Sequence, residues 1–165
     1  AAKKAASIHF DEAAFAFRHG MLKSLHRLEV LNEHWPDLLL ETEAILYMNG
    51  TGHYKKACRA FLDDKVQIQL EQLLVYFIST YFCGAVYDGE ALAKAQMSAV
   101  CTGQIFDLWL ARYIENENAI SEEEKIELLY RYSREIEHSD ENLKMIEEIM
   151  AGHKVPWLHN RVESK

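Results

Sequence analysis

The sequence predicts an all-α fold, a single bundle of six to seven helices. Apolar residues recur at helical spacing along most of the 165-residue chain, and no segment sustains the alternating pattern of a strand. Hydrophobic residues make up 49% of the chain, which contains only 2 Pro and 7 Gly, so a buried core is expected and disorder is not. We expect one helical bundle domain over residues 1–152 and a loose tail over residues 153–165.

The first half of the chain predicts four helices. Apolar residues at helical spacing indicate a long amphipathic helix over 10–31. Pro36 fits the first turn of a second helix, because the amide that proline lacks has no helical partner there. That helix ends at the Gly-containing segment 49–52, which predicts a flexible turn. A short helix over 53–62 and a longer one over 65–86 follow.

The most apolar stretch of the sequence lies in the helix expected over 65–86. We expect its segment Leu73–Phe82 to form the centre of the bundle, with its aromatic residues filling the core. The next helix, over 90–115, is rich in alanine, serine and glycine, which allow helices to approach closely. We therefore expect these two helices to pack against each other.

The last two helices have clear amino-terminal signals. Ser121 and Glu124 have the spacing of a capping box, in which each side chain binds the other residue's backbone amide. The helix that they start extends to about His138, and Ser139 resembles the cap of a final helix that ends at Gly152. The 3-4-3 spacing predicts an inward-facing seam made of Ile126, Leu129, Ser133 and Ile136.

The net negative charge of the chain argues against two classes of partner. The formal net charge of −8 disfavours nucleic acid, since phosphate binding needs clustered Lys and Arg. It also disfavours an anionic membrane surface. The longest apolar run, over 73–86, is shorter than the roughly 20 residues needed to cross a bilayer. No secretory signal is visible, and we expect a cytoplasmic location.

Cysteine and histidine spacing does not predict a metal site. Cys58, Cys83 and Cys101 are widely spaced, which suits reduced thiols and fits neither a disulfide framework nor a paired-cysteine metal motif. The eight histidines form no His-x-x-x-His or Glu-x-x-His pattern with further ligands. We expect no metal and no cofactor in this chain.

Four polar side chains form the candidate functional cluster. Arg134, Glu137 and His138 lie within about one turn on the helix that Ser121 caps. Glu71 lies on the apolar face of the 65–86 helix, where an ionised carboxylate needs a cationic partner. We expect Glu71 to pair with Arg134 between the two helices, with His138 as the second candidate. The catalytic residues themselves are not predicted.

Two interpretations of this cluster are open. In the functional one, Arg134 is a fixed cation and His138 titrates near neutral pH, which suits an anion or substrate site. Glu71 would then be a general base with a raised pKa. In the structural one, these residues form helix-end ion pairs, and His138 interacts with the negative end of the helix dipole. Isolated pairs of this kind are more often structural.

Several sequence strings together resemble a known family. They are Leu128-Leu-Tyr-Arg-Tyr-Ser-Arg-Glu-Ile-Glu-His-Ser139, Leu73-Leu-Val-Tyr-Phe-Ile-Ser-Thr-Tyr-Phe82, Ala85-Val-Tyr-Asp88 and Leu28-Glu-Val-Leu-Asn-Glu-His-Trp-Pro36. The chain resembles the C-terminal helical region of bacterial flagellin lysine-N-methylase-like proteins from about residue 28 to residue 150. The first string is the most distinctive.

The resemblance implies a function for the full-length family. Its members are large cytoplasmic enzymes that methylate lysines of flagellin with S-adenosylmethionine, and their N-terminal part carries cysteine motifs suited to an iron–sulfur cluster. This chain has three scattered cysteines, so we expect it to be a C-terminal fragment or shortened relative, inactive alone. Its partners would be the upstream cysteine-rich domain and a protein substrate. The alternative is a stand-alone helical interaction module without enzymatic activity.

Overall fold

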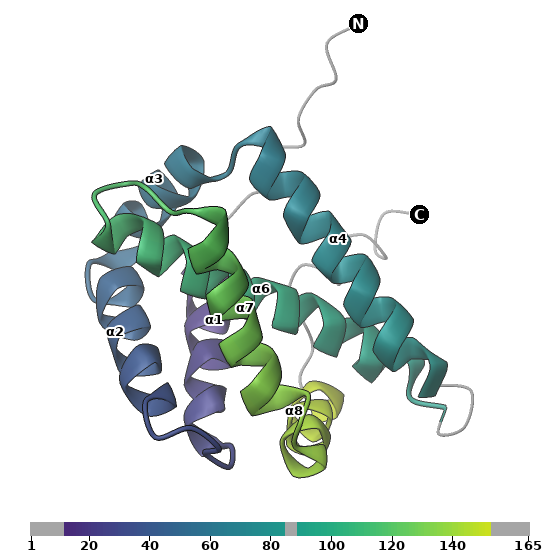
Figure 1. The fold of residues 1–165 in the computed structure, drawn as a ribbon. Coiled ribbons are helices and arrows are strands. Elements are labelled where there is room, and N and C mark those ends of the chain that lie inside the picture. The colour runs from purple at the N-terminus through teal and green to yellow at the C-terminus, as the bar shows by residue number, and fades with distance from the viewer. Residues whose placement is uncertain (1–11, 85–88, 153–165) are drawn as a thin grey trace, which may run out of the picture.

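The computed structural model describes residues 12–84 and 89–152, and every regular element in these ranges is a helix (Figure 1). The seven α-helices there are α1 (Glu12–Ser24), α2 (Trp35–Tyr47), α3 (Gly50–Phe61), α4 (Asp64–Tyr81), α6 (Ala91–Glu115), α7 (Glu122–Ile136) and α8 (Asp140–Gly152). Two short 3-10 helices follow α1 and α4: η1 (Leu25–Arg27) and η2 (Phe82–Gly84). The all-α prediction is confirmed. The tail predicted over 153–165 lies outside the described residues.

Helix α6 is the centre of the bundle. The other helices pack around it, and its residues from Gln104 to Ala111 are all buried. A helix that is apolar nearly all round is stable only when neighbours cover every side of it. The predicted packing of α4 against α6 is confirmed. The prediction that Leu73–Phe82 forms the centre is wrong, because α4 packs on the outside of α6.

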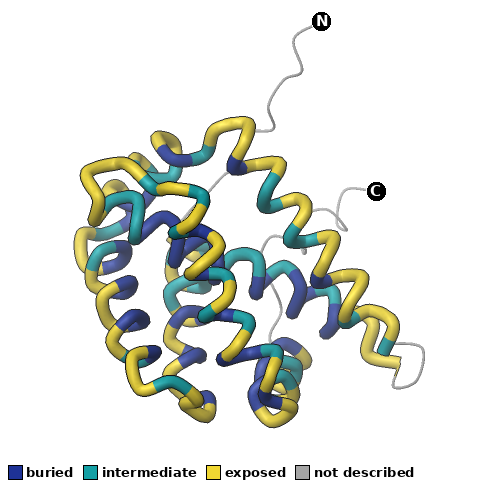
Figure 2. The backbone as a smooth tube through the Cα atoms, viewed as in Figure 1, coloured by how far each residue is buried: buried dark blue, intermediate teal, exposed yellow. Residues whose placement is uncertain are grey.

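Helix α4 buries one narrow face and exposes the other, as the colouring along this helix in Figure 2 shows. Val66 and Phe77 are buried, whereas Ile68 and Val75 are 58% and 57% exposed. No element within residues 12–84 and 89–152 covers this exposed apolar face. The aromatic residues of this region therefore only partly fill the core, since Tyr76 and Phe82 are also exposed.

Helix α1 is shorter than predicted. The expected helix over 10–31 ends at Ser24 and continues only as the 3-10 turn η1. Beyond it, the amide of Glu29 donates to Asn142 Oδ1 at 2.8 Å, and the amide of Leu31 donates to Glu135 Oε2 at 2.9 Å. Side chains from α7 and α8 thus bind amides that a continued helix would have used internally.

Helix α3 begins earlier than predicted. The segment 49–52 was expected as a flexible turn, but Gly50 to Gly52 form the first turn of α3. Gly50 has a φ of 75°, a left-handed conformation that glycine adopts without a steric penalty. Only Met48 and Asn49 separate α2 from α3, and the left-handed conformation of Gly50 contributes to the change of direction.

The amino-terminal signals of the last helices are confirmed. Ser121 and Glu124 form the predicted capping box, at 3.1 and 2.8 Å, and the amide of Asn142 donates to Ser139 Oγ at 3.2 Å. The predicted inward seam of α7 is partly wrong, because Ile126 is exposed. The buried residues are Lys125, Leu128, Tyr132, Glu135 and Ile136. The buried residues of α7 still follow the 3.6-residue helical period, but they lie on a different side of the helix from the predicted seam.

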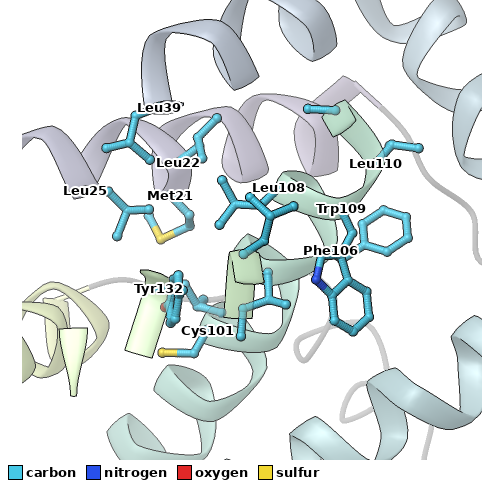
Figure 3. Packing of buried hydrophobic residues seen from close by; sticks show 14 of the residues in the cluster. Met21, Leu22, Leu25, Leu39, Cys101, Phe106, Leu108, Trp109, Leu110 and Tyr132 are labelled. Carbon is cyan, nitrogen blue, oxygen red and sulfur yellow. The ribbon is translucent and has the colours of Figure 1, made fainter. Parts of the chain in front are cut away.

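Within the core, which also includes side chains of α3, α4 and α8, α1, α2, α6 and α7 meet in the region that Figure 3 shows. Met21, Leu22 and Leu25 meet residues of α6 such as Leu108, and Tyr132 of α7 approaches from the other side. A buried polar chain crosses this core: Tyr132 Oη donates to Gln104 Oε1 at 2.6 Å, and Gln104 Nε2 donates to the carbonyl of Met21 at 2.8 Å. These bonds fix the relative positions of three helices.

Candidate functional site

The structure does not bring the predicted polar cluster together. Glu71 lies exposed on α4, Arg134 lies exposed on α7, and they form no ion pair with each other. The predicted Glu71–Arg134 pair is therefore wrong. Glu71 shares the exposed face of α4 with Ile68 and Val75, so water solvates its carboxylate and no buried cation is needed.

Glu137 and His138, the other two predicted residues, have separate surroundings. Glu137 accepts a hydrogen bond from Tyr76 Oη at 2.8 Å, and this bond raises the pKa of the tyrosine. His138 is exposed just beyond the last residue of α7. Of the four predicted residues, Arg134 is the one that lines the cleft described next.

A cleft of about 240 Å³ lies between the start of α2 and one face of α7. Its buried floor is formed by Trp35, Leu38 and Glu135, and its more exposed rim is formed by Asn32, His34, Glu127, Tyr130, Arg131 and Arg134. Most of its lining side chains are polar or charged, and they surround the apolar side chains of Trp35 and Leu38. This cleft is the candidate functional site.

Charges in the cleft are unevenly paired. Arg131 donates to Glu127 at 2.6 Å, one turn apart on α7, so these two side chains neutralise each other. Arg134 forms no ion pair with any residue in the described part of the chain. Its guanidinium offers five donors at the rim, where an acceptor on a ligand can reach them.

Glu135 is the unusual residue of the cleft. Glu135 is only 1% exposed. Its carboxylate oxygen Oε2 accepts a hydrogen bond from the amide of Leu31. The other oxygen, Oε1, is buried and has no hydrogen-bond partner among the described residues. A buried carboxylate oxygen without a donor is costly, and this one is enclosed by the protein and not open to the cleft.

The segment before α2 is held firmly against this site. Asn142 accepts from the amide of Glu29, and its Nδ2 donates to the carbonyls of Glu29 and Glu135 at 2.9 and 2.7 Å. With the Leu31–Glu135 bond, this network ties the chain between α1 and α2 to α7 and α8. The floor of the cleft is therefore preorganised.

A second polar centre surrounds Asp107 inside the bundle. Its carboxylate accepts from Arg18 at 2.6 Å, from Tyr54 at 2.6 Å and from Tyr47 at 2.7 Å. Burial alone would lower the pKa of Arg18, but the charge and hydrogen bond of Asp107 together with Tyr54 and Tyr47 outweigh burial and raise it. The guanidinium also lies 5.3 Å from the ring centroid of Phe106. This centre joins α1, α2, α3 and α6.

The Asp107 centre suits structure better than catalysis. Burial raises the pKa of Tyr47 and of Tyr54, and the charge of Asp107 adds to this effect. Both phenols therefore remain protonated donors and cannot serve as bases. Every oxygen of the carboxylate is satisfied, so the centre resembles a buried ion pair that fixes helix positions.

A third cluster gathers basic side chains around Glu43 on α2. His19 lies 2.6 Å, Lys23 3.3 Å and His26 3.8 Å from its carboxylate oxygens. Burial would raise the pKa of Glu43, but hydrogen bonds from His19 and Lys23 outweigh it and lower the pKa. His19 also stacks on Tyr47 with ring centroids 4.5 Å apart. These contacts attach α1 to α2.

The described residues do not form a metal centre. No group of three His, Cys, Asp or Glu side chains within 12–84 and 89–152 could hold a metal ion. Burial raises the pKa of Cys58 and of Cys101 to about 12, which disfavours the thiolate that binds metals and attacks electrophiles. The helices described are also too short or too polar to cross a membrane.

Comparison with known protein families shows which family the chain belongs to. The family described as FliB lysine N-methylase C-terminal domain matches residues 3–157. The chain belongs to this family. No curated protein and no solved structure matches it. The predicted resemblance is thus confirmed, and the cleft between α2 and α7 is a feature of a FliB C-terminal domain.

Sequence reasoning missed most of the residues that matter in this FliB domain. Glu135 stands in the distinctive string from Leu128 to Ser139, but its role depends on the amide of Leu31, more than 100 residues away in sequence. Asp107 is flanked by apolar residues in its helix, and an acid in such a stretch signals that a buried partner is needed. That signal was available in the sequence, although the partner was not.

Proposed function

We propose that this chain forms the substrate-side part of a protein-lysine N-methylase. In this proposal the enzyme uses S-adenosylmethionine, flagellin is the substrate, and the cysteine-rich part that carries methyl-transfer chemistry lies upstream. Membership of the FliB C-terminal domain family is the observation that carries the proposal. The cleft lined by Arg134 supports it, since it offers charged and aromatic groups to a protein segment.

The residues present do not fit an iron–sulfur cluster. Such clusters need several convergent cysteine thiolates. Cys58, Cys83 and Cys101 lie on three separate elements, and the pKa values of two of these thiols are raised by burial. We expect the isolated chain to transfer no methyl groups.

A charge reversal at the cleft tests the proposal. In the full-length enzyme, Arg134→Glu removes a guanidinium that forms no ion pair with any described residue, and it should raise KM for flagellin while leaving kcat nearly unchanged. Charge-assisted hydrogen bonds contribute about 1.5–3 kcal/mol, so the rise should be about tenfold or more. Methylated lysines are counted by mass spectrometry at several flagellin concentrations.

Lys144→Glu is the matched control, because Lys144 is an exposed lysine on α8 away from the cleft. It makes the same change of charge and should leave KM unchanged. Equal effects of the two variants, or none, would contradict a substrate-side role for the cleft.

A second candidate function is a helical interaction module without enzymatic activity. The exposed apolar face of α4, with Ile68 and Val75, favours it, since such faces often contact other proteins. Unchanged methylation of flagellin by an enzyme that lacks residues 12–152 would favour this alternative.

A further inference from the structure

An apolar stripe follows the outer side of α4, on the exposed face that Figure 2 shows. Its residues are Ile68, Glu71, Val75, Ile78 and Phe82, and we call them the outer stripe. All five are exposed, and four are large apolar residues. Their 3-4-3-4 spacing places them on one side of a helix. A continuous exposed row of apolar side chains is typical of a surface that another segment contacts.

The outer stripe contains one charge, and that charge is acidic. Between Val66 and Gly84, Glu71 is the only charged residue. A second copy of α4 packed on the stripe would take this carboxylate out of water without offering it a cation, which is unfavourable. The matching occupant therefore carries apolar side chains together with a basic residue.

The segment 153–165, which follows α8 directly, has this composition. Its apolar side chains include Val155, Trp157 and Leu158, and its Lys and Arg residues number three against one Glu. It is therefore net positive, whereas the whole chain has a formal net charge of −8. The family match continues past α8 to residue 157, so the first part of this segment belongs to the domain that the family shares.

The end of α8 lies close to the end of α4. Lys94 of α6 donates to Glu147 of α8 at 2.7 Å, and its Cε lies 3.1 Å from the position of a Cβ atom added at Gly84. One lysine side chain thus joins α8 to the turn that ends α4. Gly152 ends α8 about 8 Å beyond Glu147 along the helix axis. The segment therefore starts near the Phe82 end of the outer stripe.

We propose that residues 153–165 of this chain bind along the outer stripe, from its Phe82 end towards Glu71. Trp157 contacts Phe82, since two aromatic side chains pack well edge to face. Arg161 lies beside Glu71, where its guanidinium donates to the carboxylate. This inference does not depend on the proposed function.

The length of the segment permits this path. An extended chain advances roughly 3.3 Å per residue, so Trp157 can lie about 16 Å from Gly152 and Arg161 about 13 Å further on. The rise of an α-helix, about 1.5 Å per residue, separates Phe82 from Glu71 by about 16 Å. The long side chain of arginine spans the remaining few ångströms. Arg161 can therefore reach Glu71 while Trp157 contacts Phe82.

Binding of the segment changes the meaning of the exposed face. The outer stripe is then an internal contact of the domain and is not open to other proteins, so it no longer favours the second candidate function. Only a few side chains take part, and the contact should therefore add little to the stability of the bundle. Substitutions on the stripe should move the segment without unfolding the helices.

Cys83 offers a position for a spin label next to the outer stripe. It is exposed, whereas burial raises the pKa of Cys58 and of Cys101 to about 12, so these two thiols react slowly at neutral pH. With the label on Cys83 of the 165-residue chain, the amide signals of Val155, Trp157 and Leu158 should lose most of their intensity in nuclear magnetic resonance spectra. Full intensity of these signals would overturn the proposal.

Two matched variants separate binding from mere proximity to the label. Val75 on the stripe is 57% exposed and Leu40 on α2 is 56% exposed, so Val75→Lys and Leu40→Lys make equivalent changes. Val75→Lys removes an apolar contact and repels a basic segment, and at least half of the lost intensity should return. Leu40→Lys should behave like the unmodified chain. Melting temperatures check that both variants fold, and equal intensities in the two would overturn the proposal.

A mixed sample tests whether the segment binds a second copy. Spin-labelled chains without isotope enrichment are mixed with isotope-enriched chains that carry no spin label, so any loss of signal arises between molecules. We expect no loss for residues 155–158. A loss in this sample would assign the outer stripe to the segment of another copy and would overturn the proposal.

A charge exchange tests the position of Arg161. Glu71→Lys should repel Arg161 and restore part of the lost intensity, and adding Arg161→Glu to it should reverse that effect. Failure of the double variant to do so would refute the pairing of Arg161 with Glu71. None of these measurements uses methylation, so their failure leaves the proposed function untouched.

Discussion

At the scale of single residues, the buried ion pair between Arg18 and Asp107 should matter most for stability. Asp107 is 2% exposed and accepts three hydrogen bonds, so asparagine at this position leaves the partly buried Arg18 guanidinium without a counter-charge and removes one of the two accepting oxygens. Breaking a buried pair in this way costs about 3–5 kcal/mol. We expect Asp107→Asn to lose about this much in chemical denaturation.

A double-mutant cycle with Arg18→Met separates the ion pair from general packing. The double variant should lose clearly less stability than the sum of the two single variants, because neither charge is then left alone. Arg131→Met, which breaks an exposed pair with Glu127, should cost less than about 1 kcal/mol. Additive losses for Arg18 and Asp107 would contradict the coupling.

Glu43 should give the chain a component of stability that depends on pH. Its pKa in the folded chain is lowered from the ordinary value of 4.5, so the folded state favours the ionised form. This stabilisation is present above pH 4.5 and is lost as pH falls through the lower folded-state pKa. The contacts that attach α1 to α2 should therefore weaken in acid.

Melting temperatures at two pH values test this prediction. At pH 7, Glu43→Gln should melt below the unmodified chain, and the difference should shrink at an acidic pH below the lowered folded-state pKa of Glu43, where both carry a neutral side chain at this position. Glu41→Gln, at an exposed position of the same helix, is the control and should melt like the unmodified chain at pH 7. A constant difference at both pH values would show that Glu43 acts through packing alone.

At the scale of elements, α4 should respond to substitution differently on its two faces. Phe77 is fully buried, and truncation of a buried phenylalanine costs about 3–5 kcal/mol. Val75, two residues away, is 57% exposed and should tolerate Val75→Ala within about 0.5 kcal/mol. Urea denaturation of Phe77→Ala and Val75→Ala measures both. Similar losses would mean that another element covers the outer face of α4.

At the scale of the whole molecule, six helices packed around α6 should unfold together. Buried side chains from α1, α2, α3, α4, α7 and α8 belong to the same core as those of α6. Small domains with one continuous core unfold in a single cooperative transition. We expect coincident melting curves from circular dichroism and tryptophan fluorescence, which would support one domain over 1–152. Two separate transitions would contradict it.

Periodicity and capping made the helices predictable. Local signals such as Pro36, Ser121 and Ser139 act within one turn of the chain, so the starts of three helices follow from sequence. Helix ends were less predictable. The predicted helix over 10–31 ends at Ser24. Beyond it, the side chains of Glu135 and Asn142, which are distant in sequence, accept from the amides of Leu31 and Glu29.

The sequence by itself determined the all-α fold, the family and most helix starts, since these depend on local spacing and on strings of residues. Only the tertiary structure decided which helix is central and which polar groups meet. Glu71 and Arg134 stay apart, whereas Arg18 meets Asp107 and Glu135 meets Leu31. The physical reason is that helical period fixes a face of each helix, but packing alone selects the neighbour that covers it.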